Sequence, residues 1–145
     1  MPKEIKIILC DIDGTIADNS HRQFLLKNNN NWDKFFLEMK NDLPIYPVIN
    51  KVIDEFRDGK EIIFLTGRPS NYEKETNEWL KKYFTFEYKL VMRRENDRRN
   101  KLIVKKELFL NNFSVNEIDY VIDNDSELLH QWKELGLRAL DAIDI

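Results

Sequence analysis

The amino-acid sequence predicts a single α/β domain, residues 1–145, with a doubly wound, mostly parallel sheet covered by helices on both faces. Short apolar runs rich in β-formers alternate with segments of helical period along the whole chain, which is the pattern of parallel strands joined by crossover helices. The composition agrees with one globular domain, because 42% of the residues are hydrophobic, 34% are charged, and only four are glycine and four proline.

Five strands are expected, each carrying the consecutive apolar residues typical of strands that are buried on both faces. They span residues 5–11, 61–66, 88–92, 119–123 and 138–143. Runs of this kind need helices above and below the sheet, so the segments between them are expected to be helical.

The predicted helices are recognised by their boundary residues and by apolar positions of period 3.6. Pro47 and Gly59 mark the beginning and end of the first helix after residue 43. Ser70 followed by Glu73 predicts a capping box at the start of another helix, and Gly136 ends the last.

Residues 17–43 form a longer connection than a simple crossover needs, and we expect them to be a small lid insertion. The asparagine tract at residues 28–31 is expected to be a loop. The residues after it occur at i, i+3, i+4 and i+7 and predict a helix with an aromatic face: Trp32, Phe35, Phe36 and Met39. For Trp32, packing beside Phe35 and Phe36 is favoured over stacking on a base.

Charge and cysteine content exclude several classes of protein. The net charge is −3, from 23 basic and 26 acidic residues, so no attraction of the whole molecule to nucleic acid or an anionic membrane is expected. The single cysteine, Cys10, cannot form an internal disulfide and is interpreted as a small core residue. No signal-like or membrane-spanning run occurs, so we expect a cytoplasmic protein with no membrane contact and no obligate protein partner.

Two carboxylates follow the first apolar run, where Asp11 and Asp13 are separated by one residue and followed by Gly14. The carboxyl ends of parallel strands are where open α/β folds bind ligands. Two acids this close need a cation or a proton. We expect bound Mg²⁺ to neutralise one and a proton the other, with Gly14 allowing a sharp turn.

Two later strands also end in polar residues. Thr66, Gly67 and Arg68 supply a hydroxyl, a flexible turn with free N–H groups and a guanidinium, which are donors for an anion. The fourth strand runs into oxygen ligands suited to Mg²⁺, namely Asp123, Asn124 and Asp125.

A lysine is expected to complete this site. On a helix, Lys105 lies between Leu102 and Phe109 on a face that is otherwise apolar, and an inward ammonium needs a negative partner. Lys105 is therefore preferred, with Lys101 and Lys106 as the alternatives; the competing explanation for Lys105 is a surface lysine whose ammonium reaches solvent.

These motifs, in this order, resemble those of the haloacid dehalogenase-like (HAD-like) phosphohydrolases, which have a Rossmann-like fold. A narrower resemblance is to the 3′-phosphatase domain of bacteriophage polynucleotide kinases. It is carried by the segments Asp42-Leu43-Pro44-Ile45-Tyr46-Pro47-Val48-Ile49, Leu65-Thr66-Gly67-Arg68, Leu90-Val91-Met92-Arg93, Asp97-Arg98-Arg99 and Val104-Lys105-Lys106-Glu107-Leu108-Phe109.

The resemblance implies a Mg²⁺-dependent hydrolysis of a phosphomonoester in two steps. Asp11 would attack phosphorus and form an aspartyl-phosphate, and Asp13 would protonate the leaving group and later activate water. Thr66 and Lys105 would hold the phosphoryl oxygens. Asp11, the Asp13 carbonyl and Asp123 would bind Mg²⁺.

One position departs from the narrower family, which commonly has two adjacent acids where this chain has Asp123 and Asn124. The next acid is Asp125. An amide adds no negative charge, so metal affinity is expected to be weaker while the chemistry stays the same.

Substrate contacts are expected from a basic segment and from the insertion. From residue 93 to 106 there are seven basic and two acidic residues, a local excess of +5, which suits a nucleic-acid phosphate or equally a solvated loop. Arg93 and Arg99 match the narrower family's pattern. His21 and Arg22, in the insertion, are further candidates for contact with a sugar or base.

The leading function is therefore hydrolysis of DNA or RNA 3′-phosphate ends, and a phosphatase of free mononucleotides or other small esters is the alternative. A receiver-like signalling domain shares the Asp, Thr, Lys and Mg²⁺, but it lacks a second acid such as Asp13. An idle nucleic-acid binding module is the remaining class. No Gly-x-x-x-x-Gly-Lys motif is present, so kinase activity is not expected.

Overall fold

The fold is a five-stranded parallel sheet with helices on both faces, and the computed structural model describes residues 4–27 and 31–145. The strand order is β5-β4-β1-β6-β7, with β1 at the centre. In chain order the strands of this sheet are β1 (Ile7–Cys10), β4 (Glu61–Pro69), β5 (Lys89–Arg93), β6 (Ile118–Asp123) and β7 (Ala139–Asp141). All five predicted strands are thus present, and every pair is parallel.

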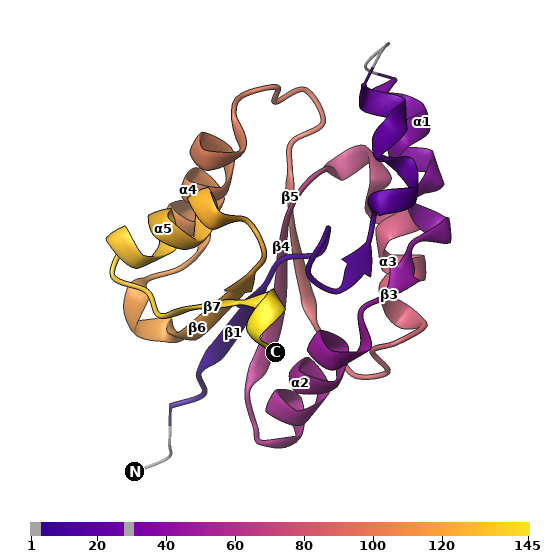
Figure 1. The fold of residues 1–145 in the computed structure, drawn as a ribbon. Helices are drawn as coiled ribbons and strands as arrows, with labels where there is room; N and C mark the ends of the chain where they lie inside the picture. Colours follow the sequence, from indigo (N-terminus) through magenta and orange to yellow (C-terminus); the bar gives the residue numbers. More distant parts are fainter. Residues whose placement is uncertain (1–3, 28–30) are drawn as a thin grey trace.

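Four helices cover the two faces of the sheet (Figure 1). They are α2 (Tyr46–Arg57), α3 (Glu73–Lys81), α4 (Lys101–Asn112) and α5 (Ser126–Glu134). Side chains alternate along β1, so Ile8 and Cys10 pack with α2 and α3, whereas Ile7 and Leu9 pack with α4 and α5. This alternation places an apolar core on each side of one sheet.

The segment from residue 17 to 43, which we call the insertion, lies beside the carboxyl edge of the sheet. Its two ends pair as the antiparallel strands β2 (Ala17–Asp18) and β3 (Leu43–Pro44). Between them lie two 3-10 turns at Ser20–Leu26 and Glu38–Asn41, and the helix α1 (Trp32–Leu37). The predicted aromatic helix is therefore present but shorter, because Met39 belongs to the 3-10 turn that follows it.

The predicted loop at residues 28–31 lies outside the described residues except for Asn31. The Asn31 side chain accepts a hydrogen bond from the Lys34 backbone and caps α1.

The predicted capping box at Ser70 and Glu73 is wrong. Strand β4 continues to Pro69, so Ser70 already belongs to a 3-10 turn, Ser70–Tyr72, and α3 begins at Glu73 without a side-chain cap. The boundary residues of the other helices behave as expected, since Gly59 and Gly136 both have a φ of +92° after a helix end. None of the helices in the described part of the chain is long and apolar enough to cross a membrane.

Candidate active site

The candidate site lies at the carboxyl edge of the sheet, where the three central strands end. Asp11 follows β1, Thr66 lies near the end of β4, and Asp123 ends β6. Because β4 and β6 flank β1, residues that are 55 or more positions apart in sequence lie on neighbouring strands. All three side chains belong to buried residues.

Lys105 reaches this edge from α4 and connects two of the carboxylates. Its Nζ donates to Asp11 Oδ1 at 2.7 Å and lies 3.4 Å from Asp123 Oδ2. Burial alone would lower the pKa of Lys105, but the charges of Asp11 and Asp123 outweigh it, so the pKa lies above its usual range. Of the three candidate lysines, Lys105 is the one that is buried in the site, since Lys101 pairs with Asp125 and Lys106 is exposed.

Asp11 lies in surroundings that are more negative than one lysine can neutralise. Burial and the nearby charge of Asp123 raise the pKa of Asp11 to about 7, against the opposing effect of Lys105. The two oxygens of Asp11 face different partners: Oδ1 accepts from Lys105, and Oδ2 accepts from the Thr15 hydroxyl at 2.9 Å.

Asp13 is held by two buried arginines. Arg22 Nη2 lies 2.6 Å and Arg68 Nη2 2.8 Å from Asp13 Oδ1, and Arg68 Nε donates to Oδ2 at 3.0 Å. Burial would raise the pKa of Asp13, but Arg68 and then Arg22 bring it below its usual value. The expectation that a proton neutralises one acid of the pair is therefore wrong for Asp13, because two guanidinium groups do so instead.

Asp42 completes this cluster and was not identified as a site residue from the sequence. It is buried and accepts from Arg22 Nε and Nη2, both at 2.8 Å, and from His21 Nε2 at 2.7 Å. Arg68 Nη2 lies 3.4 Å from Asp42 Oδ2, the oxygen that also accepts from Arg22 Nη2. The spacing of these residues in the sequence does not predict that they are in contact. Asp42 reaches both arginines because the insertion folds onto the edge of the sheet.

Several predicted substrate residues have other partners in the structure. Arg22 and Arg68 are at most 1% exposed and face Asp13 and Asp42 instead of open solvent. The predicted flexible turn with free N–H groups after Thr66 is wrong, because β4 continues there through a bulge and the Arg68 N–H donates to Thr66 Oγ1 at 3.1 Å.

Arg93 and Arg99 lie together beside Gly67, at the wall of a cavity of about 480 Å³. Arg93 Nε donates to the Gly67 carbonyl at 2.8 Å. Arg99 forms ion pairs with Asp97 and Glu107 at 2.8 and 2.6 Å. Both arginines are thus near the phosphate-binding candidates, but each already has protein partners.

Asn124 occupies the corner between β1 and β6. With its amide turned to match its neighbours, the nitrogen donates to Asp11 Oδ2 and the Asp13 carbonyl at 3.1 Å and to Thr15 Oγ1 at 3.2 Å. The turn needs Gly14, whose φ is +79° and where a Cβ would collide with the Asn124 amide. The neighbouring Asp125 points elsewhere: it caps α5 and pairs with Lys101.

The oxygens at this corner fit a hard divalent cation. Asp11 Oδ2 and the Asp13 carbonyl each lie 3.1 Å from the Asn124 amide nitrogen, and Lys105 contacts both Asp11 and Asp123, so oxygens of the kind that Mg²⁺ prefers lie around this corner. Two buried carboxylates face one ammonium, so a positive charge is missing. Within residues 4–27 and 31–145, no three His, Cys, Asp or Glu side chains cluster as a metal site, so main-chain oxygen would have to contribute.

Comparison with solved structures shows the fold to which the chain belongs. A class C acid phosphatase from Bacillus anthracis with tungstate bound matches 90% of this chain and 54% of its own, with a TM-score of 0.63 and 16% identity. A putative β-phosphoglucomutase from Thermotoga maritima matches 94% of the chain with a TM-score of 0.52. At this level of identity these likenesses show the fold alone. The class comes from a family model of a HAD-like phosphatase domain that matches residues 5–144, and the chain is a phosphatase of that class.

A family model gives a narrower assignment than the class. Residues 5–144 match the polynucleotide kinase PNKP phosphatase domain, and the chain belongs to that family. A chain in the structure of the Pnkp1/Rnl/Hen1 RNA repair complex is 29% identical over 94% of this chain, with a TM-score of 0.78. A putative bifunctional polynucleotide kinase/RNA ligase of Autographa californica nuclear polyhedrosis virus is 29% identical over 135 residues. The chain spans 42% of the first and 18% of the second.

Proposed function

We propose that this protein hydrolyses phosphomonoesters at polynucleotide 3′ ends through an aspartyl-phosphate on Asp11. The observation that carries the proposal is the buried contact of Asp11 with Lys105 at 2.7 Å, beside Asp123 and next to the Asp13 cluster. Membership of the PNKP phosphatase family supports the polynucleotide end as substrate.

Lys105 would position the nucleophile and the phosphate together. Its ammonium holds Asp11 Oδ1 in a fixed place and supplies positive charge where three phosphoryl oxygens become more negative. Thr66, on the neighbouring strand, offers a hydroxyl next to the same edge. When bound by Asp11, the Asp13 carbonyl and Asp123, Mg²⁺ would reduce the repulsion between carboxylate and phosphate.

Asp13 would move the protons. Its lowered pKa keeps it ionised in the free enzyme, which is the form that accepts a proton from water when the aspartyl-phosphate is hydrolysed. A phosphate dianion beside it opposes the two arginines and raises its proton affinity, which favours protonation before the leaving group departs. Arg22 and Arg68 fix the carboxylate so that a single group can serve both steps.

The test is a substrate panel with Mg²⁺, run on the wild type and on Asp11→Asn. It contains 3′-phosphorylated oligodeoxynucleotides and oligoribonucleotides, 5′- and 3′-mononucleotides, and p-nitrophenyl phosphate. We expect the highest kcat/KM for 3′-phosphorylated oligonucleotides and a loss of at least about 10³-fold in Asp11→Asn.

Other outcomes would replace the proposal. Equal or higher kcat/KM for mononucleotides would make the protein a nucleotidase. Full activity in Asp11→Asn would remove the nucleophile. A single turnover with a small phosphodonor and a persistent acyl phosphate would indicate a receiver-like domain instead.

A further inference from the structure

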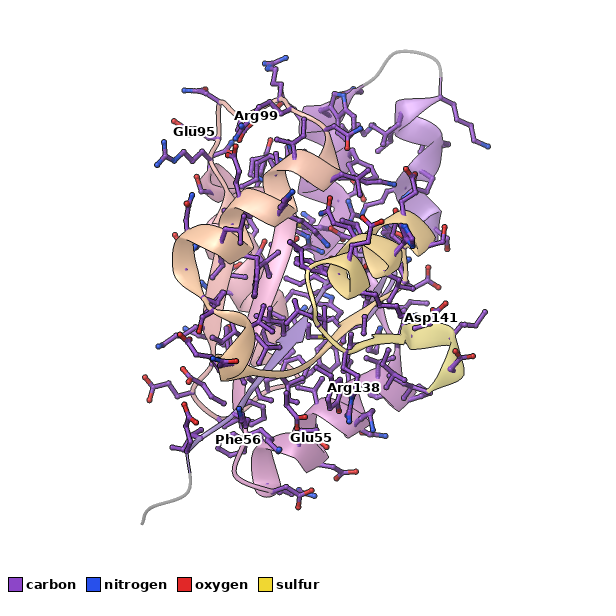
Figure 2. The ribbon with its side chains drawn as sticks, turned by 90° about the vertical axis from the view of Figure 1, so that its left-hand side faces the viewer. Glu55, Phe56, Glu95, Arg99, Arg138 and Asp141 are labelled. Atoms are coloured by element: carbon purple, nitrogen blue, oxygen red, sulfur yellow. The ribbon has the colours of Figure 1, made fainter. Side chains whose placement is uncertain are left out.

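The cavity of about 480 Å³ lies between the insertion and the loop that joins β5 to α4. In Figure 1 this loop arches over one end of the molecule, and α1 stands at the same end on the other side. Figure 2 shows Glu95 and Arg99 of the loop at that end, opposite Glu55 and Phe56 of α2. The volume is within the range of small-ligand pockets in proteins.

One wall of the cavity is aromatic. Trp32, which remains 51% exposed, stacks on Phe36 with ring centroids 5.8 Å apart and planes inclined by 26°. Phe36 in turn packs against Tyr72 at 5.0 Å. Trp32 also contacts Phe35 edge-on at 5.7 Å, so it packs as expected but keeps a free surface. A half-exposed indole held by other aromatic rings is a ready stacking surface.

The floor of the cavity connects it to the candidate active site. Gly67, which lines the cavity, lies between Thr66 and Arg68. Arg93 donates to the Gly67 carbonyl at 2.8 Å and to the Asp97 and Arg99 carbonyls at 3.0 and 2.7 Å, so it joins the floor to the β5–α4 loop. A group bound at Thr66 is therefore next to whatever fills the cavity.

The charges that line the cavity are mostly paired. Arg99 is paired with Asp97 and Glu107, and Lys101 with Asp125. Arg98 is the one lining cation that forms no hydrogen bond or ion pair with any residue of the described chain. The cavity therefore offers a large stacking surface and a single available positive charge, which does not suit a ligand recognised through several phosphates.

We propose that this cavity takes the unpaired nucleobase of the terminal nucleotide, stacked on Trp32, with Arg98 contacting the phosphodiester one residue upstream. The inference rests on the proposed function, because it assumes that the 3′-phosphate of the same nucleotide lies at Asp11. Stacking on Trp32 needs an exposed base face, so the enzyme selects single-stranded ends and accepts any base.

The test measures equilibrium binding of oligonucleotides with a 3′-hydroxyl end, which needs no catalysis. Fluorescence anisotropy compares a single-stranded 12-mer, the same 12-mer with an abasic 3′-terminal nucleotide, and a blunt duplex. We expect Trp32→Ala to weaken binding of the first by about 10-fold, with partial recovery in Trp32→Phe. The abasic and duplex ends should bind the wild type about 10-fold more weakly and be insensitive to Trp32→Ala.

Phe24→Ala is the matched control, because Phe24 is an aromatic residue of the insertion that is 63% exposed and does not line the cavity. It should leave binding unchanged. Thermal unfolding of wild type, Trp32→Ala and Phe24→Ala reports on folding, and hydrolysis of p-nitrophenyl phosphate, which has no base, should be equal in wild type and Phe24→Ala.

Three results would overturn the cavity assignment: equal binding of abasic and normal ends, equal effects of Trp32→Ala and Phe24→Ala, or no oligonucleotide binding by the wild type. Binding with the expected pattern but without hydrolysis of 3′-phosphorylated ends would instead refute the proposed function and leave the base site standing. The two proposals therefore fail separately.

Discussion

At the residue scale, the two acids of the Asp11–Asp13 pair differ in how their charge is compensated. Asp13 has two guanidinium groups, whereas Asp11 shares one ammonium with Asp123. The proposed catalytic pair is thus asymmetric before any ligand binds. Asp11, which would bind the metal, lacks enough positive charge around it, whereas Asp13, which would move protons, is fully compensated.

This asymmetry predicts a pH dependence of stability in protein prepared without metal. The pKa of Asp11 is raised to about 7 in the folded state from about 3.9 in the unfolded chain. Between these values the folded state holds a proton that the unfolded chain has released, so stability falls as pH rises from about 4 to about 7. Asp11→Asn should remove this loss and raise Tm by about 3 °C or more at pH 8.

Thermal unfolding in EDTA at pH 5 and pH 8 measures the effect. Asp54→Asn, at an exposed acid of α2, is the control and should change Tm little at either pH. If Asp11→Asn is less stable than the wild type at pH 8, the carboxylate contributes stability through Lys105 and its pKa is not raised.

A second prediction concerns Asn124, which stands where the narrower family commonly has a second acid. Asn124→Asp should lower the Mg²⁺ concentration for half-maximal activity several-fold, because a carboxylate adds charge beside Asp11 and the Asp13 carbonyl. It should also lower Tm in EDTA and increase the stabilisation by Mg²⁺, since one more buried acid must be neutralised. A Mg²⁺ titration followed by activity and by Tm gives both readouts; unchanged values would place the metal away from this corner.

At the scale of elements, the insertion is joined to the sheet edge by Arg22. This residue is fully buried, and its guanidinium contacts Asp13, Asp42 and the Phe35 carbonyl. Arg22→Met should destabilise the protein by about 3 kcal/mol, because it leaves two buried carboxylates with fewer partners. The loss should appear in urea unfolding and as faster amide exchange across residues 17–43.

Arg94→Ala, at an exposed arginine without an ion pair in the described chain, is the matched control and should change stability by less than about 0.5 kcal/mol. Exchange that rises equally over the whole chain in Arg22→Met would contradict a specific role in holding the insertion.

Helices and strands were predicted well where a local pattern of apolar residues defines them, and poorly where contacts between distant residues do. Five strands and the helices with strong apolar periodicity are present, because burial on two faces forces continuous apolar runs. The predicted start of α3 at Ser70 was wrong, because pairing with β5 extends β4 as far as Pro69 and the helix begins only at Glu73. The contacts of Asp42 could not be predicted, since they bridge 20 to 26 residues through an insertion whose path no periodicity defines.

At the scale of the whole molecule, the net charge is −3, so an anionic substrate must be attracted by a local basic segment, residues 93–106. Its predicted excess of +5 overstates what a polyanion meets, because Arg99, Lys101 and Lys105 are paired with carboxylates. Arg93 is bonded to three carbonyls. Of the seven basic residues, three have neither an ion pair nor a side-chain hydrogen bond within the described chain: Arg94, Arg98 and Lys106.

Binding of single-stranded oligonucleotides should therefore depend weakly on salt. Each phosphate contact contributes a slope of about −0.7 in log K against log salt, so one to three contacts predict a loss of about 3- to 20-fold between 50 and 200 mM KCl. Seven contacts would predict a loss of about 900-fold. Arg98→Ala should reduce the slope by about 0.7, whereas Lys51→Ala, on α2 at the other end of the molecule, should leave it unchanged. A steep slope in the wild type would mean that the ion pairs of Arg99 and Lys101 open to bind phosphate, and recognition would then be governed by charge and not by stacking.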